Sequence, residues 1–210
     1  MEEVFPQVVL TVLGIPIRDT VISTWVAMVI IIGLAWLVQR KLPAAVEMLI
    51  DFLRGQISGL MGEIDVDPYV AFLGTLLLFL LVANNLGLAP LLQTPTKDIN
   101  TPLALAIVLL FAVHAFGIQK MGLLGYLKEK ASPMTILDVI TDFSRTMSLS
   151  VRLFGNIIAG EFIVAVMYRL VAVVVPLPMI GLSMITSILQ AYVFMVLATS
   201  AISSAVKSDG

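Results

Sequence analysis

Long apolar runs separated by short polar segments dominate the chain, and they predict a bundle of membrane-spanning helices. A helix of about 20 apolar residues crosses the hydrocarbon core of a bilayer. Residues 20–38, 69–88 and 102–119 are runs of about this length. Two longer runs, residues 134–175 and 179–206, complete the pattern. We therefore expect an all-α polytopic membrane protein with five hydrophobic helices.

The segment between the first two runs has a different pattern. In residues 43–61 apolar side chains recur every three or four positions, whereas Glu47, Asp51 and Arg54 lie on the other side. Pro43 suits the first turn of a helix. We expect an amphipathic helix lying at the membrane interface; a solvated connecting helix is the alternative.

The polar segments divide residues 1–210 into four parts of one membrane domain. Arg40 and Lys41 follow the first run and a basic loop follows the third, and such loops favour the cytoplasmic side. We therefore expect the N-terminus outside and the C-terminus in the cytoplasm. The expected parts are an N-terminal span, the interfacial helix, a two-span hairpin and a long helical hairpin, in residues 1–42, 43–68, 69–130 and 131–210.

Composition agrees with this picture and narrows the chemistry. The chain is 60% hydrophobic and only 12% charged, with a mean hydropathy of +1.07. This leaves no room for a large soluble domain, and nothing suggests a nucleic-acid partner. The absence of cysteine excludes disulfides, thiol catalysis and cysteine-ligated metal sites. We expect neither a metal nor a cofactor.

One arginine lies far inside an apolar run. Arg152 is followed by a long apolar stretch, and a guanidinium stays protonated at physiological pH. A charge at membrane depth is costly, so such a residue is a candidate functional site. At about 100° per residue, Ser148 and Asn156 share its helix face, whereas Glu161 points away from it. The alternative is an arginine that extends its charged end to the membrane surface.

The run that contains Arg152 has no proline over residues 134–175. As one helix it would be roughly 60 Å long, whereas the hydrocarbon core is about 30 Å thick. Either it breaks into a surface helix and an upright span, or it lies strongly tilted. Gly155 and Gly160 would let another helix approach closely. Residues 176–178 are expected to form a tight return.

Further polar residues lie within the other runs. Asn84 lies near the end of the second run, and its amide needs a partner unless it marks a polar helix end. The single histidine, His114, suits a structural role better than a proton relay. Ser183 and Gln190 are seven positions apart on one face of the last run, and Gln190 needs a partner from another helix.

Four motifs together resemble subunit a of the F-type rotary ATP synthases. They occur in the same order as in that family, within a similarity that extends from about residue 43 to the C-terminus. The motif with the arginine is the most specific of them. The motifs are NNLGLAP, PTKDIN, RLFGNIIAGE and QAYVFMVL, at residues 84–90, 95–100, 152–161 and 190–197.

The resemblance implies an ion-translocating stator whose last two helices are long and tilted beside a rotating c-ring. Arg152 would strip ions from the rotor carboxylates and separate two half-channels. Glu161 would handle protons in the outer half-channel, which Asn84 would help to line, while Asn156 and Gln190 would help to place Arg152.

Three further residues are weaker candidates. Ser148 and Ser183 would line the channel, and His114 is the weakest candidate. Ser183 stands where relatives often carry histidine or a carboxylate, which calls a two-member relay into question.

The resemblance also implies partners and a location. The partners would be the c-ring, the peripheral-stalk b subunits, the rest of the ATP synthase complex and the lipid bilayer. The chain would have no enzymatic activity alone. Protons are the favoured coupling ion and Na⁺ is the alternative. The short chain without a transit peptide suggests the inner (plasma) membrane of a prokaryote.

Two other classes of function remain as alternatives. An independent secondary transporter or channel would transport without partners and would usually contain internal repeats, which we do not find. An intramembrane hydrolase needs a nucleophile with a base, or a metal site. The single histidine and the lack of cysteine argue against it.

Overall fold

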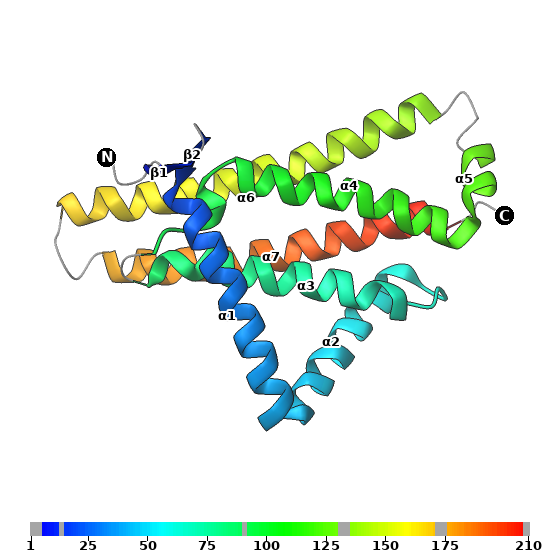
Figure 1. Ribbon diagram of the computed structural model, residues 1–210, viewed down its shortest axis with the longest axis horizontal. Coiled ribbons are helices and arrows are strands. Elements are labelled where there is room, and N and C mark those ends of the chain that lie inside the picture. Colours follow the sequence, from blue (N-terminus) through cyan, green and yellow to red (C-terminus); the bar gives the residue numbers. More distant parts are fainter. Residues whose placement is uncertain (1–5, 13–14, 90–91, 130–134, 171–175, 208–210) are drawn as a thin grey trace.

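The chain folds into a helical bundle preceded by a small β-hairpin (Figure 1). A computed structural model describes residues 6–12, 15–89, 92–129, 135–170 and 176–207. The all-α prediction is confirmed for the membrane part. The elements are, in order, β1 (Val8–Val12), β2 (Ile15–Arg18), α1 (Asp19–Lys41), α2 (Pro43–Met61), α3 (Asp67–Asn85), η2 (Leu86–Leu88), η3 (Pro95–Lys97), α4 (Asn100–Met121), α5 (Leu123–Glu129), α6 (Thr135–Leu170) and α7 (Pro176–Val206).

Five of the described helices are long and apolar enough to cross a membrane, as the apolar runs predict. They are α1, α3 with its extension η2, α4, most of α6, and α7. Each has more than the about 20 residues that cross a bilayer core of about 30 Å. The short helix α5 was not predicted.

Helix α2 has the bounds that its periodicity predicts, residues 43–61. Its apolar side is buried through Leu53, Ile57 and Met61, and it contacts α3 and α7. Met48 and Phe52 remain exposed. The helix is therefore amphipathic, and it also exposes apolar side chains on the outside of the bundle. Its position at the membrane interface stays a prediction.

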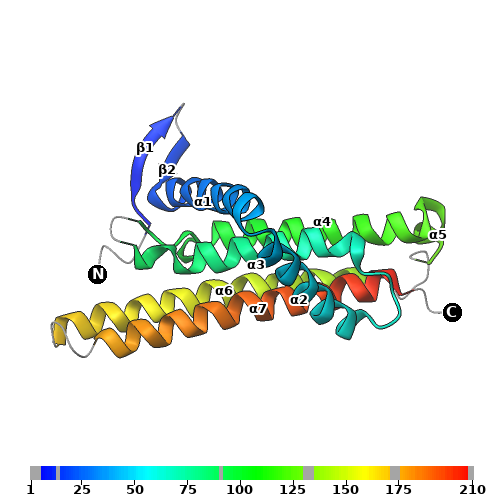
Figure 2. The same ribbon diagram turned by 90° about the horizontal axis from the view of Figure 1, so that it is seen from below.

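Helices α3, α4, α6 and α7 lie side by side along the long axis of the molecule, while α1 crosses them obliquely (Figures 1 and 2). Their shared core includes Leu73, Leu109, Leu153 and Phe194, which are nearly inaccessible. Between helices in a membrane such close packing, rather than exclusion of water, provides the attraction. The pairing of α6 with both α4 and α7 fixes which faces of α6 are covered.

Helix α6 is continuous over 36 residues, so the alternative of two separate helices is wrong. At 1.5 Å per residue it is roughly 54 Å long, which exceeds the thickness of the hydrocarbon core. Gly160 allows the predicted close approach, since a Cβ there would lie 2.8 Å from Ser183 Oγ of α7. At Gly155 no atom lies within 4 Å of a Cβ built on it, so no described helix of this chain approaches closely there.

The predicted tight return at residues 176–178 is wrong. Pro176 and Pro178 instead form the first turn of α7. Proline is favoured there because the first amides of a helix have no partner within it. The connection between α6 and α7 lies in residues 171–175, outside the described residues.

The β-hairpin was also not predicted. Val8 pairs with Arg18, and Thr11 pairs with Pro16, which has no amide hydrogen to donate between the strands. The Asp19 amide donates to the Gln7 carbonyl oxygen (2.9 Å) and so joins the hairpin to the start of α1. Val8 and Val9 are exposed.

Candidate functional site

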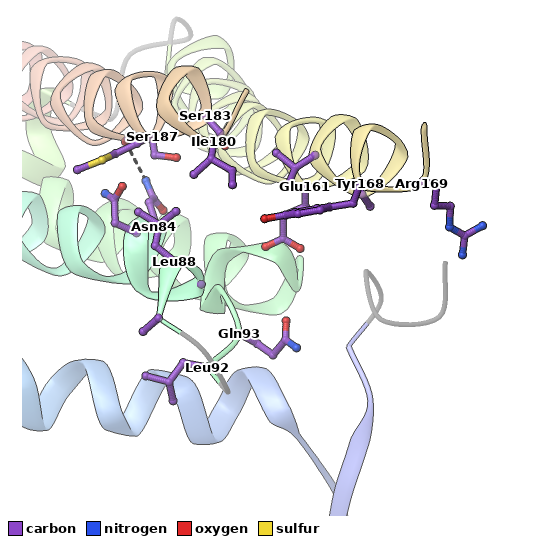
Figure 3. A pocket seen from close by; sticks show the side chains of 16 residues that line it. Asn84, Leu88, Leu92, Gln93, Glu161, Tyr168, Arg169, Ile180, Ser183 and Ser187 are labelled. Atoms are coloured by element: carbon purple, nitrogen blue, oxygen red, sulfur yellow. Dashed lines mark hydrogen bonds between the residues drawn. The ribbon is translucent and has the colours of Figure 1, made fainter. Parts of the chain in front are cut away.

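A polar pocket of about 640 Å³ lies where α3 ends and α7 begins (Figure 3). Its walls are formed by α3 and η2, by the loop that follows η2, and by α6 and α7. Three residues predicted from the sequence, Asn84, Glu161 and Ser183, line it together although they come from three different helices. The other polar residues in its wall are Asn85, Gln93, Tyr168, Arg169 and Ser187.

Hydrogen bonds from two directions hold Asn84 in place. Its Nδ2 donates to the Ser187 carbonyl oxygen of α7 (3.2 Å), and its Oδ1 accepts from Thr96 Oγ1 (2.8 Å). The side chain is only 5% exposed. The amide therefore connects α3, α7 and the loop, which satisfies the need for partners that its position in an apolar run predicts.

Glu161 extends from α6 into this pocket (Figure 3). Its pocket-facing neighbours on α6 are Val164, Ala165 and Tyr168, the positions that share one helix face. The close approach of Gly160 to Ser183 brings α6 and α7 together beside it. The pocket thus places a carboxylate against polar groups of two other helices.

The charge partner of this carboxylate is not evident from the sequence. Lys97 Nζ lies 3.9 Å from Glu161 Oε2, and the lysine side chain is 0% exposed. Its Nζ also donates to Gln93 Oε1, and the Thr94 hydroxyl is a further hydrogen-bond partner of Glu161. The only feature of the sequence that points to this site is the polar run at residues 93–98 between two apolar runs. That run does not indicate that the loop folds inward.

The loop that carries Lys97 is anchored by its neighbour Asp98. Arg18 Nη1 donates to Asp98 Oδ2 (2.8 Å), as does Thr20 Oγ1 (3.2 Å), and the Asn100 amide donates to Oδ1 (3.1 Å). Burial by itself would raise the pKa of Asp98, but these hydrogen bonds and the Arg18 charge outweigh it and hold the pKa below its usual range. Asp98 is therefore ionised and fixes the loop to α1.

Arg152 lies on a different face of α6 from Glu161, as predicted. Its side chain is exposed, and so are those of Ser148, Ala159 and Ile163, which share the face. Among the described residues Arg152 forms no ion pair or hydrogen bond through its guanidinium. This face presents a positive charge on an otherwise weakly polar surface.

Asn156 and Gln190 lie at the contact between α6 and α7. Asn156 Nδ2 approaches the Thr186 carbonyl oxygen at 3.5 Å, at the limit of a hydrogen bond. Gln190 is buried, and its Nε2 has no partner among the described residues. Both amides are available near the arginine-bearing stretch, and their action on Arg152 stays a prediction.

His114 lies away from this pocket. Its Nδ1 contacts the Leu110 carbonyl oxygen one turn earlier (2.8 Å), and its ring packs edge-on against Tyr126. These contacts favour the structural role. Within the described part of the chain no group of histidine, aspartate or glutamate side chains could hold a metal ion.

The fold and these residues define a polytopic membrane protein with a polar pocket on one side of a long helix and an exposed arginine on another. The chain belongs to the ATP synthase A chain family, whose model matches residues 21–203. It is 40% identical over 204 residues to ATP synthase subunit a 2 of Bradyrhizobium sp. strain BTAi1, which covers 92% of this chain and 91% of that protein. It is 36% identical over 207 residues to ATP synthase subunit a of Gloeobacter violaceus, with 90% and 84% covered.

Proposed function

We propose that this chain is the ion-translocating stator of a rotary F-type ATP synthase. The observation that carries the proposal is the division of α6 into two faces. One face exposes Arg152, and the other directs Glu161 into a polar pocket. A stator needs both: a surface charge that meets the rotor and a polar path that leads ions toward it.

Arg152 would act on the carboxylates of a ring of small hairpin subunits, the c-ring. A rotor carboxylate that holds its ion can face lipid at little cost, whereas an ionised carboxylate needs a counter-charge. The guanidinium never deprotonates, so it provides that charge at every step. An approaching carboxylate gives up its ion, passes Arg152 as an anion and takes up an ion beyond it.

The pocket would form part of the outer half-channel. Glu161 is its acidic residue, and Asn84 and Ser183 line it with groups that can bind water or a cation. Ser148 lies on the exposed face beside Arg152, where it would meet the rotor. Protons are the favoured coupling ion because a single carboxylate suffices to pass them; Na⁺ is the alternative.

The proposal includes partners and an orientation. Besides the c-ring, the partners are the peripheral-stalk b subunits and the rest of the complex, which performs ATP synthesis, while this chain has no enzymatic activity alone. The location is the inner (plasma) membrane of a prokaryote. Strand β1 and the last turns of α7 lie toward opposite ends of the long axis (Figure 1), which suits an outer N-terminus and a cytoplasmic C-terminus.

The first prediction tests Arg152. Arg152→Lys keeps a charge but loses the broad, always-ionised fork, so we expect ATP-driven ion pumping to fall at least about 100-fold. Arg152→Ala also removes the barrier, and we expect a passive leak in addition. Pumping and leak are measured in vesicles that hold equal amounts of assembled complex.

Arg145→Lys is the matched control. Arg145 lies about two turns earlier on nearly the same face of α6, but it is half-buried, whereas Arg152 is exposed. We expect this variant to pump within about threefold of wild type. Normal pumping by Arg152→Lys, or transport by the purified chain without its partners, would contradict the proposal; the second result would favour an independent transporter.

A further inference from the structure

Lys97 combines two properties that are rarely found together. Its side chain is completely inaccessible, and it belongs to a connecting loop rather than to a helix. An ammonium group removed from water needs a compensating charge and hydrogen bonds. Gln93 supplies a hydrogen bond, and the carboxylate of Glu161, 3.9 Å away, supplies the charge.

The environment of the two charged groups differs. The Glu161 side chain is 26% exposed and borders the pocket, whereas Lys97 lies behind it. An ion entering the pocket therefore meets the carboxylate first. The lysine is not among the residues that line the pocket, so it acts on the ion through Glu161.

The loop is also fixed in position. The helical turn that ends at Lys97 contacts α1, α3, α4 and α6. The next residue, Asp98, is held by Arg18 and Thr20 of the N-terminal region. The ammonium group is thus mounted on a rigid support, which a positioning charge requires.

We propose that Lys97 is a positioning residue of the outer half-channel, a tethered cation that holds the Glu161 carboxylate directed into the pocket. This inference rests on the proposed function of Glu161. When the carboxylate accepts a proton its attraction to the ammonium group is lost, and when it passes the proton on the pair forms again. Lys97 would thereby favour release of the proton from Glu161.

Variants in assembled complexes test this. Lys97→Met keeps the length of the side chain but removes its charge, and we expect ATP synthesis and ATP-driven pumping to fall about tenfold, equivalent to about 1.4 kcal/mol. Lys97→Arg keeps the charge and should restore rates to within about threefold of wild type. Lys120→Met, which removes an exposed lysine of α4, is the matched control and should pump normally.

The deciding variant combines Lys97→Met with Glu161→Gln. Residues that act as a unit are not additive, so Lys97→Met should slow the Glu161→Gln complex by less than about twofold. If Lys97→Met alone fails to assemble, the double variant should restore assembly because it removes the uncompensated carboxylate.

Three results would overturn the inference. Lys97→Met could pump at the wild-type rate, it could slow the Glu161→Gln complex as much as the wild-type complex, or the double variant could also fail to assemble. Failure of the proposed function is distinguishable, because in that case Glu161→Gln alone pumps at the wild-type rate. That result would also remove the basis for this role of Lys97.

Discussion

At the scale of single residues, α6 separates its functions by helix face. Two glycines illustrate the separation. Gly160 lies against α7, where a Cβ would approach Ser183 Oγ to 2.8 Å, whereas Gly155 lies one turn after Arg152 with open space around it. Under the proposed function, Gly160 tests packing inside the chain and Gly155 tests contact with a partner.

We predict opposite effects of leucine at these two glycines. Gly160→Leu should lower the midpoint of thermal unfolding of the purified chain, because the larger side chain forces α6 and α7 apart. Gly155→Leu should leave that midpoint unchanged or slightly higher, since leucine favours the helix by up to about 1 kcal/mol. In the complex, however, Gly155→Leu should abolish pumping by obstructing the rotor.

Unfolding of the detergent-solubilised chain and pumping by the assembled complex are measured for both variants. Normal pumping by Gly155→Leu would show that the exposed face beside Arg152 does not meet a partner closely. An unchanged midpoint for Gly160→Leu would show that the helices tolerate separation at Ser183.

Not every role of a single residue could be predicted from the sequence. Arg152 could, because a permanent charge in an apolar run is conspicuous without knowledge of the fold. Lys97 could not, because a lysine in a polar loop looks solvated. Its burial against Glu161 depends on a contact across 64 positions, which only the fold reveals.

At the scale of elements, the loop between α3 and α4 is attached through η3 to α1, α3, α4 and α6. Asp98 accepts hydrogen bonds from Arg18 and Thr20, which precede or begin α1. We predict that Asp98→Asn loosens the loop. Hydrogen bonds to charged groups contribute about 1.5–3 kcal/mol, and the variant should lose a similar amount in the free energy of unfolding.

The pH dependence of this variant follows from the lowered pKa of Asp98. A carboxylate with a lowered pKa stabilises the fold above its unfolded value of about 3.9, and loses this effect as the pH falls through the folded value. Wild type should therefore lose more stability than Asp98→Asn when the pH falls from about 5 to about 2.5.

Thermal unfolding across this pH range, with hydrogen exchange of residues 92–100, measures the effect. Arg54→Gln serves as a control, because its ion pairs with Asp51 and Asp67 are exposed and contribute little. Equal acid sensitivity of wild type and Asp98→Asn would contradict the assignment.

The elements themselves were largely predictable, for local reasons. The periodicity of residues 43–61 fixes α2, and run length fixes the spans. Besides the short helix α5, two features were missed. The apolar run Val8–Val12 lacks the alternation of a typical strand, and Pro16 argues against a strand at its partner. Pro176 and Pro178 predict a turn after α6, but proline is equally suited to the first turn of a helix, which is where they lie in α7.

At the scale of the whole molecule, charge decides the orientation. Arg40 and Lys41 end α1, and Lys120 lies in the last turn of α4. Positive residues next to spans are retained in the cytoplasm. We therefore predict that the pocket and the hairpin face the outer surface and that the end of α4 faces the cytoplasm.

Cysteine labelling tests this orientation without background, because the chain contains no cysteine. Val9→Cys places a thiol in the exposed hairpin, and Lys207→Cys places one after α7. In intact cells a membrane-impermeant maleimide should label the first position only, and after permeabilisation it should label both. Leu42→Cys, at the exposed junction of α1 and α2, should behave like Lys207→Cys. Labelling of all three positions from one side would contradict an odd number of spans. Labelling of Lys207→Cys but not of Val9→Cys in intact cells would reverse the orientation, and the pocket would then lie on the cytoplasmic side.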